Sequence, residues 1–152
     1  YDQDPGPGID LRLLRLDEFS LAVPQAHRFF GRTSLRAVEL RDEPFVWLAR
    51  SVNPATHDAI LAYFTSQGVA PDIVQYATSS ASQLNFISVG MGVGVVTSMA
   101  RAEPLHPLGL CRLEGLDLKL RYCVAHVAGD PNPALAAFLD IARAVADDIP
   151  TG

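Results

Sequence analysis

The chain has 152 residues and a formal net charge of −5, with 49% hydrophobic and 19% charged residues. This composition is typical of one globular domain with a real hydrophobic core, and it excludes an intrinsically disordered chain. The sequence contains no apolar run of the roughly 18 residues that a membrane-spanning helix needs, and no signal-peptide pattern. It also contains no basic cluster, from which nucleic-acid binding draws most of its affinity. We therefore expect a cytoplasmic domain with no membrane partner and no DNA affinity of its own.

The first part of the chain predicts two strands and a short helix. Two extended runs, Leu11–Leu16 and Phe19–Val23, are joined by the polar pair Asp17-Glu18. The segment SLRAVELRDEP is typical of a short helix that Ser34 is placed to cap and that Pro44 must follow.

The middle of the chain alternates between strand and helix patterns. FVWLA predicts a buried strand, and NPATHDAILAYFTSQG predicts the clearest helix, with Pro54 near its first turn and Gly68 after its end. PDIVQYA predicts the next strand. A helix over Ala81–Val89 and a short strand over Val93–Val96 are expected to follow.

Three glycines, Gly90, Gly92 and Gly94, lie between that helix and that strand. A dinucleotide-binding G-x-G-x-x-G loop needs a strand before the glycines and a helix after them, so that the helix N-terminus faces the pyrophosphate. Here the helix comes first. We therefore expect Gly90 to end the helix and Met91-Gly92 to form a tight turn, with no nucleotide cofactor.

The end of the chain predicts two more strands, in LGLCRL and LKLRYCVAHV, and a closing amphipathic helix in NPALAAFLDIARAVADD. Alternating strands and helices favour an α/β sandwich with a mostly parallel sheet. The runs near 11–23 and 118–127 lie outside this alternation and are consistent with a paired connection toward a second lobe. The residues of the last helix expected to face the core are Leu135, Phe138, Leu139, Ile141 and Ala142.

Five segments, taken in order, carry a resemblance to a known family. VGMGV at 89–93 resembles a helix-to-strand turn, AVPQAHRF resembles a Pro-x-x-His-Pro-Leu segment with Arg28 in place of a proline, and DEPFVWLAR, the Pro54 helix and GVAPDIVQYA follow in order and spacing. Together they resemble the effector-binding region of LysR-type transcriptional regulators over nearly the whole chain. Thr97 departs from the family pattern, because a proline is expected after the Val93–Val96 strand.

The resemblance implies an α/β sandwich of the type 2 periplasmic-binding-protein kind. Residues 24–119 would form regulatory subdomain II, while residues 1–23 and 120–152 would supply the crossing strands, the return strand and the last helix of regulatory subdomain I. The N-terminal winged helix-turn-helix would be absent. It further implies a homo-oligomer, a dimer or tetramer, formed through the regulatory domain, with DNA bound only through the absent domain.

Two helix N-termini follow predicted strands and offer unpaired N–H groups and hydroxyls to an anion. Each hydroxyl is explained as well by an ordinary helix cap. Arg50 is explained either by a bidentate pair with an effector carboxylate or, slightly favoured, by a solvated charge. Matching positions of the family contribute to the effector cleft, which implies these binding residues: Ser51, Pro54, Ala55, Thr56, Thr78 and Ser79.

Catalysis and metal binding are not expected. The four histidines, His27, His57, His106 and His126, lie far apart in sequence without a spaced His or Cys partner, and no G-x-S-x-G elbow is present. His57, in the first turn of a helix, is most simply a surface residue. The expected function is sensing of a small metabolite, a carboxylate, by a LysR-type regulator. The alternative is a solute-binding domain of the same fold in transport, which an upstream secretion signal or lipid-anchor cysteine would favour.

Overall fold

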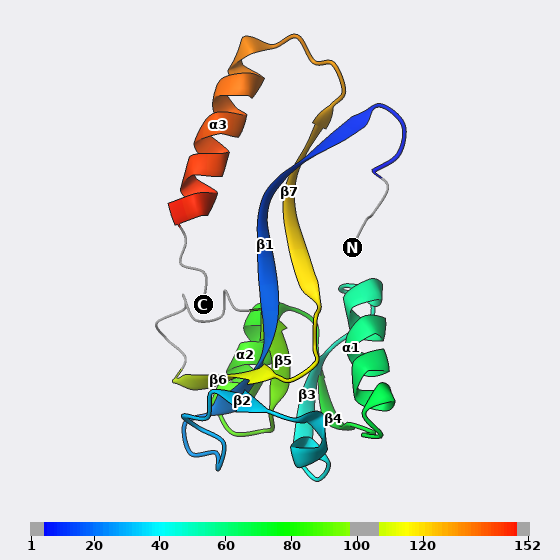
Figure 1. Ribbon diagram of the computed structural model, residues 1–152, viewed down its shortest axis with the longest axis vertical. Coiled ribbons are helices and arrows are strands. Elements are labelled where there is room, and N and C mark those ends of the chain that lie inside the picture. Colours follow the sequence, from blue (N-terminus) through cyan, green and yellow to red (C-terminus); the bar gives the residue numbers. More distant parts are fainter. Residues whose placement is uncertain (1–4, 98–106, 149–152) are drawn as a thin grey trace. The chain divides into compact units, whose positions relative to one another are not determined.

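The computed structural model describes residues 5–97 and 107–148, so His106 lies outside the described residues. Contacts divide the chain into two units, Tyr1–Asp17 with Lys119–Gly152, and Glu18–Leu118. Figure 1 shows the strands and helices of both units. No helix in the described ranges is long and apolar enough to cross a membrane.

Strand β1 (Ile9–Pro24) is continuous and passes from the first unit into the second. The prediction of two runs joined by Asp17-Glu18 is therefore wrong. Successive side chains of a strand point to opposite faces, so a polar pair fits an extended backbone without a turn. Asp17 is in fact buried, with 2% of its surface exposed.

In the unit Tyr1–Asp17 with Lys119–Gly152, β1 pairs with β7 (Lys119–Val127), which confirms the predicted pairing of the two end runs. Beyond β7, the Ala128 N–H donates to the Gly8 carbonyl at 2.9 Å. Helix α3 (Pro133–Asp148) follows.

Helix α3 forms where the sequence predicts it, but Leu139 is its one buried residue among those described. Phe138 is 54% exposed and Ile141 is 64% exposed, so the prediction that both face the core is wrong. Leu135 and Ala142 are half-buried. Helix α3 has an apolar face, as predicted, but the described strands of this unit cover little of that face beyond Leu139.

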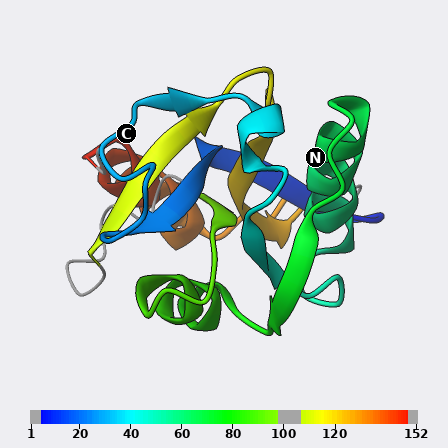
Figure 2. The ribbon, with the colours of Figure 1, turned by 90° about the horizontal axis from the view of Figure 1, so that it is seen from below.

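The unit Glu18–Leu118 is built on a parallel pair, β3 (Pro44–Leu48) and β4 (Asp72–Ala77), joined by α1 (Pro54–Ser66). Helix α2 (Ser80–Ser88) then leads to Val93, which bridges to Phe45 in the parallel sense, and on into β5 (Gly94–Thr97). Strand β4 and Val93 therefore lie on opposite sides of β3. Because both crossovers are expected to be right-handed, α1 and α2 must cover opposite faces of this sheet. Figure 2 shows that arrangement.

The second half of β1 runs antiparallel to both of its neighbours, β5 and β6 (Leu108–Leu113). The described strands form two sheets, a mixed five-stranded sheet and the parallel two-stranded sheet β3–β4. Among the described strands, the prediction of a mostly parallel sheet holds for the β3–β4 pair, the Val93 bridge and the short β2 (Ser34–Leu35) beside β6. A strand that lies between two others running the opposite way must pair antiparallel with each.

The short helix predicted after Ser34 is a 3₁₀ helix, η1 (Ala37–Leu40). Ser34 does not cap it, because Ser34 belongs to β2 and its hydroxyl donates to Glu114 Oε1 at 3.1 Å. At the start of η1, the Arg36 N–H donates to the Glu39 carboxylate at 2.9 Å. The cap is thus made by a residue inside the helix.

The core has two layers, one on each face of β3. Phe45 and Trp47 point to the α1 side, where the ring centroid of Phe45 lies 5.2 Å and that of Trp47 lies 6.0 Å from Phe64. Val46, one position between them, points to the α2 side. It joins an aliphatic cluster made of Ala22, Val46, Ala77, Leu84, Ile87 and Val96.

The glycines after α2 are structural. Gly90 has a φ of +84° and follows the C-cap residue Val89, which confirms that Gly90 ends the helix. A Cβ on Gly92 would collide with the Pro44 carbonyl oxygen and lie 2.9 Å from the Pro44 carbonyl carbon. Gly92 therefore allows the chain to approach β3 closely, where the Val93 N–H donates to that oxygen at 2.8 Å.

Candidate functional site

The carboxyl ends of β3 and β4 lie side by side. Leu48 pairs with Ala77 at the end of the ladder, and the Ala49 N–H donates to the Ala77 carbonyl at 2.8 Å. The loops that follow leave the sheet at the same edge, and α1 and α2 begin there. In open α/β sheets this is the edge at which ligands bind.

Asn53 caps α1, and most N–H groups of the first turn are already used. The Asn53 Oδ1 atom accepts the Thr56 N–H at 3.0 Å, and the Asn53 carbonyl accepts the His57 N–H at 3.0 Å. Pro54, the first residue of the helix, has no N–H to offer. The interpretation of Ser51 as a cap is therefore wrong, since Ser51 lies exposed in the preceding turn. Ala55 supplies the N–H of this turn that stays uncommitted within the described structure.

Thr56 is buried, with 6% of its surface exposed. It belongs to the face of α1 that also buries Ile60, Tyr63 and Phe64. Its Oγ1 atom has no hydrogen-bond partner in the described part of the chain. A buried hydroxyl without a partner costs about 1–3 kcal/mol, so folded proteins rarely leave one unpaired. This oxygen is the unusual atom at the edge where α1 begins.

Arg50 is bound to Asp58 on the solvent side of α1. Its Nε atom donates to Asp58 Oδ1 at 2.8 Å and its terminal nitrogen donates to Oδ2 at 2.7 Å. The hydrogen bonds from Arg50, and then from His57, lower the pKa of Asp58 to about 2. Asp58 follows Thr56 by two positions, or about 200° around the helix, so this ion pair lies on the opposite face. Arg50 is thus an exposed edge charge with a protein partner.

His57 is not the surface residue that its position predicts. Its side chain is 11% exposed, its Nδ1 atom lies 3.1 Å from Asp58 Oδ1, and its ring meets Trp47 edge to face at 6.0 Å between centroids. The imidazole therefore packs on the aromatic layer of the core, next to Thr56 in the sequence.

The N-terminus of α2 is closed by a capping box. Ser79 Oγ accepts the Ser82 N–H at 3.1 Å, and Ser82 Oγ accepts the Ser79 N–H at 3.1 Å. Ser80 is the first residue of the helix and not its cap. The N–H groups of Ser80 and Ala81 stay uncommitted among the described contacts, and Thr78 lies exposed just before them.

The register of β3 and β4 brings the six sequence-predicted residues to one edge of the sheet. Ser51, Pro54, Ala55 and Thr56 lie at the start of α1, and Thr78 and Ser79 lie at the start of α2. Sequence reasoning missed Asn53, although an Asn before a Pro is a recognisable cap signal. In the described ranges, no three His, Cys, Asp or Glu side chains gather as a metal ion would require.

The comparisons with known proteins agree with one another. The model of the LysR substrate binding domain family matches residues 1–147. AlsR of Bacillus subtilis (strain 168), an HTH-type transcriptional regulator, is 25% identical over 123 residues, which cover 81% of this chain and 41% of AlsR. The chain thus spans less than half the length of that relative.

Two solved structures share the fold. The regulatory domain of Synechocystis PCC6803 CcmR, in complex with 2-PG, has a TM-score of 0.78 at 19% identity, covering 99% of this chain and 73% of that chain. The effector binding domain of QuiR, in complex with shikimate, has a TM-score of 0.68 at 16% identity, covering 95% of this chain and 68% of that chain. These likenesses confirm the predicted α/β fold of the periplasmic-binding-protein type. With the family model matching nearly its whole length, the chain belongs to the LysR substrate binding domain family.

Proposed function

We propose that this chain is the effector-sensing domain of a LysR-type transcriptional regulator, which binds a small anionic metabolite where α1 and α2 begin. The unpaired, buried Oγ1 atom of Thr56 is the observation that carries the proposal. An effector that hydrogen-bonds to this hydroxyl would remove the cost of leaving it unpaired. The relative AlsR is a transcriptional regulator, which favours sensing over the alternative of solute transport.

A carboxylate suits this edge better than a cation does. The helix dipole favours a negative group near an N-terminus by about 0.3–1 kcal/mol, and more where the group is partly buried. The Ala55 N–H and the Thr56 hydroxyl at α1, and the N–H groups of Ser80 and Ala81 at α2, are donors that a carboxylate can accept from. The exposed Ser51, Pro54, Thr78 and Ser79 would line the same site. Arg50, paired with Asp58 on the other face of α1, is left out of it.

The bound molecules of the structural neighbours support the same class. QuiR was solved with shikimate, a small hydroxylated carboxylate, and CcmR was solved with 2-PG. Small organic acids of this kind are therefore the first ligands to try on this chain.

The wider organisation is part of the proposal. Residues 24–119 would be regulatory subdomain II, with residues 1–23 and 120–152 belonging to subdomain I, and the boundaries between the two contact units at 17/18 and 118/119 support this division. The regulator would act in the cytoplasm as a dimer or tetramer, bind DNA through a helix-turn-helix domain, and perform no catalysis. Effector binding shifts DNA binding only as far as its affinity differs between two conformations.

The test is a titration of the chain, and of the full-length regulator, with shikimate, benzoate and 2-PG. Trp47 is the single tryptophan and contacts His57, so its fluorescence reports on the start of α1. Losing a hydrogen bond to a charged ligand costs about 1.5–3 kcal/mol, so Thr56→Val is expected to weaken binding about tenfold or more.

The matched control is Thr65→Val, on the same helix. The Thr65 hydroxyl is exposed and already bonded to the Leu61 carbonyl at 2.9 Å, so this variant is expected to bind as the wild type does. Unchanged affinity in both Thr56→Val and Thr78→Val would show that these hydroxyls serve the fold and that the effector binds elsewhere. Binding of none of the three acids would contradict the carboxylate class.

A further inference from the structure

Tyr63 lies on the same face of α1 as Thr56. The two residues are seven positions apart, which is about two turns and about 10 Å along the helix axis. Tyr63 is 8% exposed, and its ring packs edge to face on Phe64 at 5.2 Å between centroids. A buried residue of this face moves with the helix as a whole.

The hydroxyl of Tyr63 reaches a segment 51 positions further along the chain. It donates to the Glu114 carbonyl oxygen at 2.8 Å. Burial, and then the nearby charge of Glu114, raises the pKa of Tyr63, so the hydroxyl keeps its proton and remains a donor. The next residue, Gly115, turns the chain with a φ of +79°, and a Cβ there would touch the Tyr63 ring at 4.0 Å.

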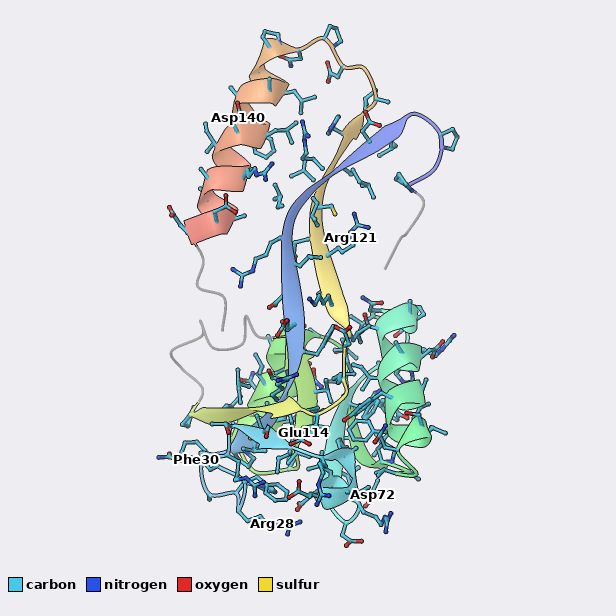
Figure 3. The ribbon with its side chains drawn as sticks, in the orientation of Figure 1. Arg28, Phe30, Asp72, Glu114, Arg121 and Asp140 are labelled. Atoms are coloured by element: carbon cyan, nitrogen blue, oxygen red, sulfur yellow. The ribbon has the colours of Figure 1, made fainter. Side chains whose placement is uncertain are left out.

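Glu114 is held from a second direction by β2. Its N–H donates to the Leu35 carbonyl at 2.9 Å, and its Oε1 atom accepts the Ser34 hydroxyl at 3.1 Å. Leu116 closes the turn by donating its N–H to the Leu113 carbonyl at 3.2 Å. Figure 3 shows Glu114 where β6 has ended and the chain leads toward β7.

The residues after Glu114 are one of the two places where the chain passes between the units. The unit Glu18–Leu118 ends here, and β7 begins at Lys119. The other passage is the continuous strand β1, between Asp17 and Glu18. The passage at 114–118 is a turn and a short irregular segment, so it has few hydrogen bonds of its own and the Tyr63 hydroxyl adds one to those of Glu114 and Leu116.

We propose that Tyr63 is a positioning residue that ties α1 to the connecting segment 114–118. A shift of α1, begun at Thr56, is carried along the helix to Tyr63 and through its hydroxyl to the Glu114 carbonyl. The regulatory consequence, that effector binding changes how the chain leaves this unit, rests on the proposed function. The tie itself, the hydrogen bond from the Tyr63 hydroxyl to the Glu114 carbonyl oxygen, is called the latch below and rests only on the contacts given above.

The first test needs no effector. Tyr63→Phe removes the hydroxyl and keeps the ring, and Tyr76→Phe, at an exposed tyrosine of β4, is the matched control. Hydrogen exchange is measured on the full 152-residue chain, with amides of α2 as the internal reference for overall stability. A hydrogen bond of this kind contributes about 0.5–1.5 kcal/mol, so the hydrogen-bonded amides of Glu114 and Leu116 are expected to exchange about two- to tenfold faster in Tyr63→Phe alone. Exchange unchanged there, or equally fast in Tyr76→Phe, would overturn the latch.

The second test separates the latch from the proposed function. In the full-length regulator, Tyr63→Phe is expected to keep the affinity for shikimate within about twofold, because the Thr56 end of α1 is intact, and to lose the effector-dependent change in DNA affinity. A full response to shikimate in this variant would overturn the coupling. If the wild type binds none of the three acids named above, the proposed ligand class fails while the exchange experiment still decides the latch.

Discussion

Thr56→Val should make the ligand-free chain more stable. The substitution replaces a hydroxyl by a methyl group of nearly the same size at a position that is 6% exposed, and the Thr56 N–H that Asn53 accepts is retained. A buried hydroxyl without a partner costs about 1–3 kcal/mol. Allowing for imperfect packing of the new methyl group, we expect the free energy of unfolding to rise by about 1 kcal/mol, which for a chain of this size raises the Tm by about 2–4 °C.

Urea unfolding followed by circular dichroism, with calorimetry for the Tm, measures this change. Thr65→Val on the same helix is the control, because its exposed hydroxyl is bonded to Leu61, and it is expected to change the free energy of unfolding by less than about 0.5 kcal/mol. If Thr56→Val lowers stability by about 1 kcal/mol instead, the hydroxyl has a partner in the ligand-free protein. The Thr56 hydroxyl would then not be a group left for the effector.

Three other predictions concern the turn after α2, the Arg50–Asp58 pair and a buried thiol. Gly92→Ala is expected to lower the free energy of unfolding, measured in urea, by about 1–3 kcal/mol, because its Cβ meets the backbone of β3. Gly68→Ala, in open space at a φ of +68°, is expected to lower it by about 1–2 kcal/mol. A larger loss of stability at Gly68 than at Gly92 would contradict this. Asp58 has a lowered pKa of about 2, so the Arg50–Asp58 ion pair contributes stability above pH 3.8 that is lost as the pH falls toward 2. Arg50→Gln should move the pKa of Asp58 back toward 3.8 in a carboxyl NMR titration. An unchanged pKa in this variant would exclude Arg50 as the cause of the lowered value. Burial raises the pKa of Cys111, which should resist thiol reagents until the chain unfolds, as mass spectrometry of the modified protein would show.

The sequence was sufficient to predict elements whose signals are local. The helix after Pro54 and the strand FVWLA were predicted because a cap, a fixed proline and a continuous apolar run each constrain the backbone directly. The elements that were missed depend on distant partners. Ser34 lies in a strand because it pairs with β6, some eighty positions away along the chain. No local sequence pattern around Ser34 predicts that partner.

The candidate site divides in the same way. Its place at two helix N-termini follows from strand and helix order, so the residues of both loops could be named from the sequence. The individual contacts of these residues could not be predicted from the sequence. Asn53 competes with Ser51 for the cap, Asp58 captures Arg50, and Ser82 engages Ser79, and each choice depends on side-chain distances of about 3 Å that only the folded chain sets.

The two layers of the core have a consequence for how this domain can change over evolutionary time. Phe45 and Trp47 support α1, while Val46 between them supports α2. Substitutions within one layer can therefore accumulate and shift one helix N-terminus while leaving the other in place. For the acid proposed above, ligand preference would then change at one helix N-terminus while the contacts at the other were kept. Strand β3 is the element that the two layers share, because its successive residues face one layer and then the other.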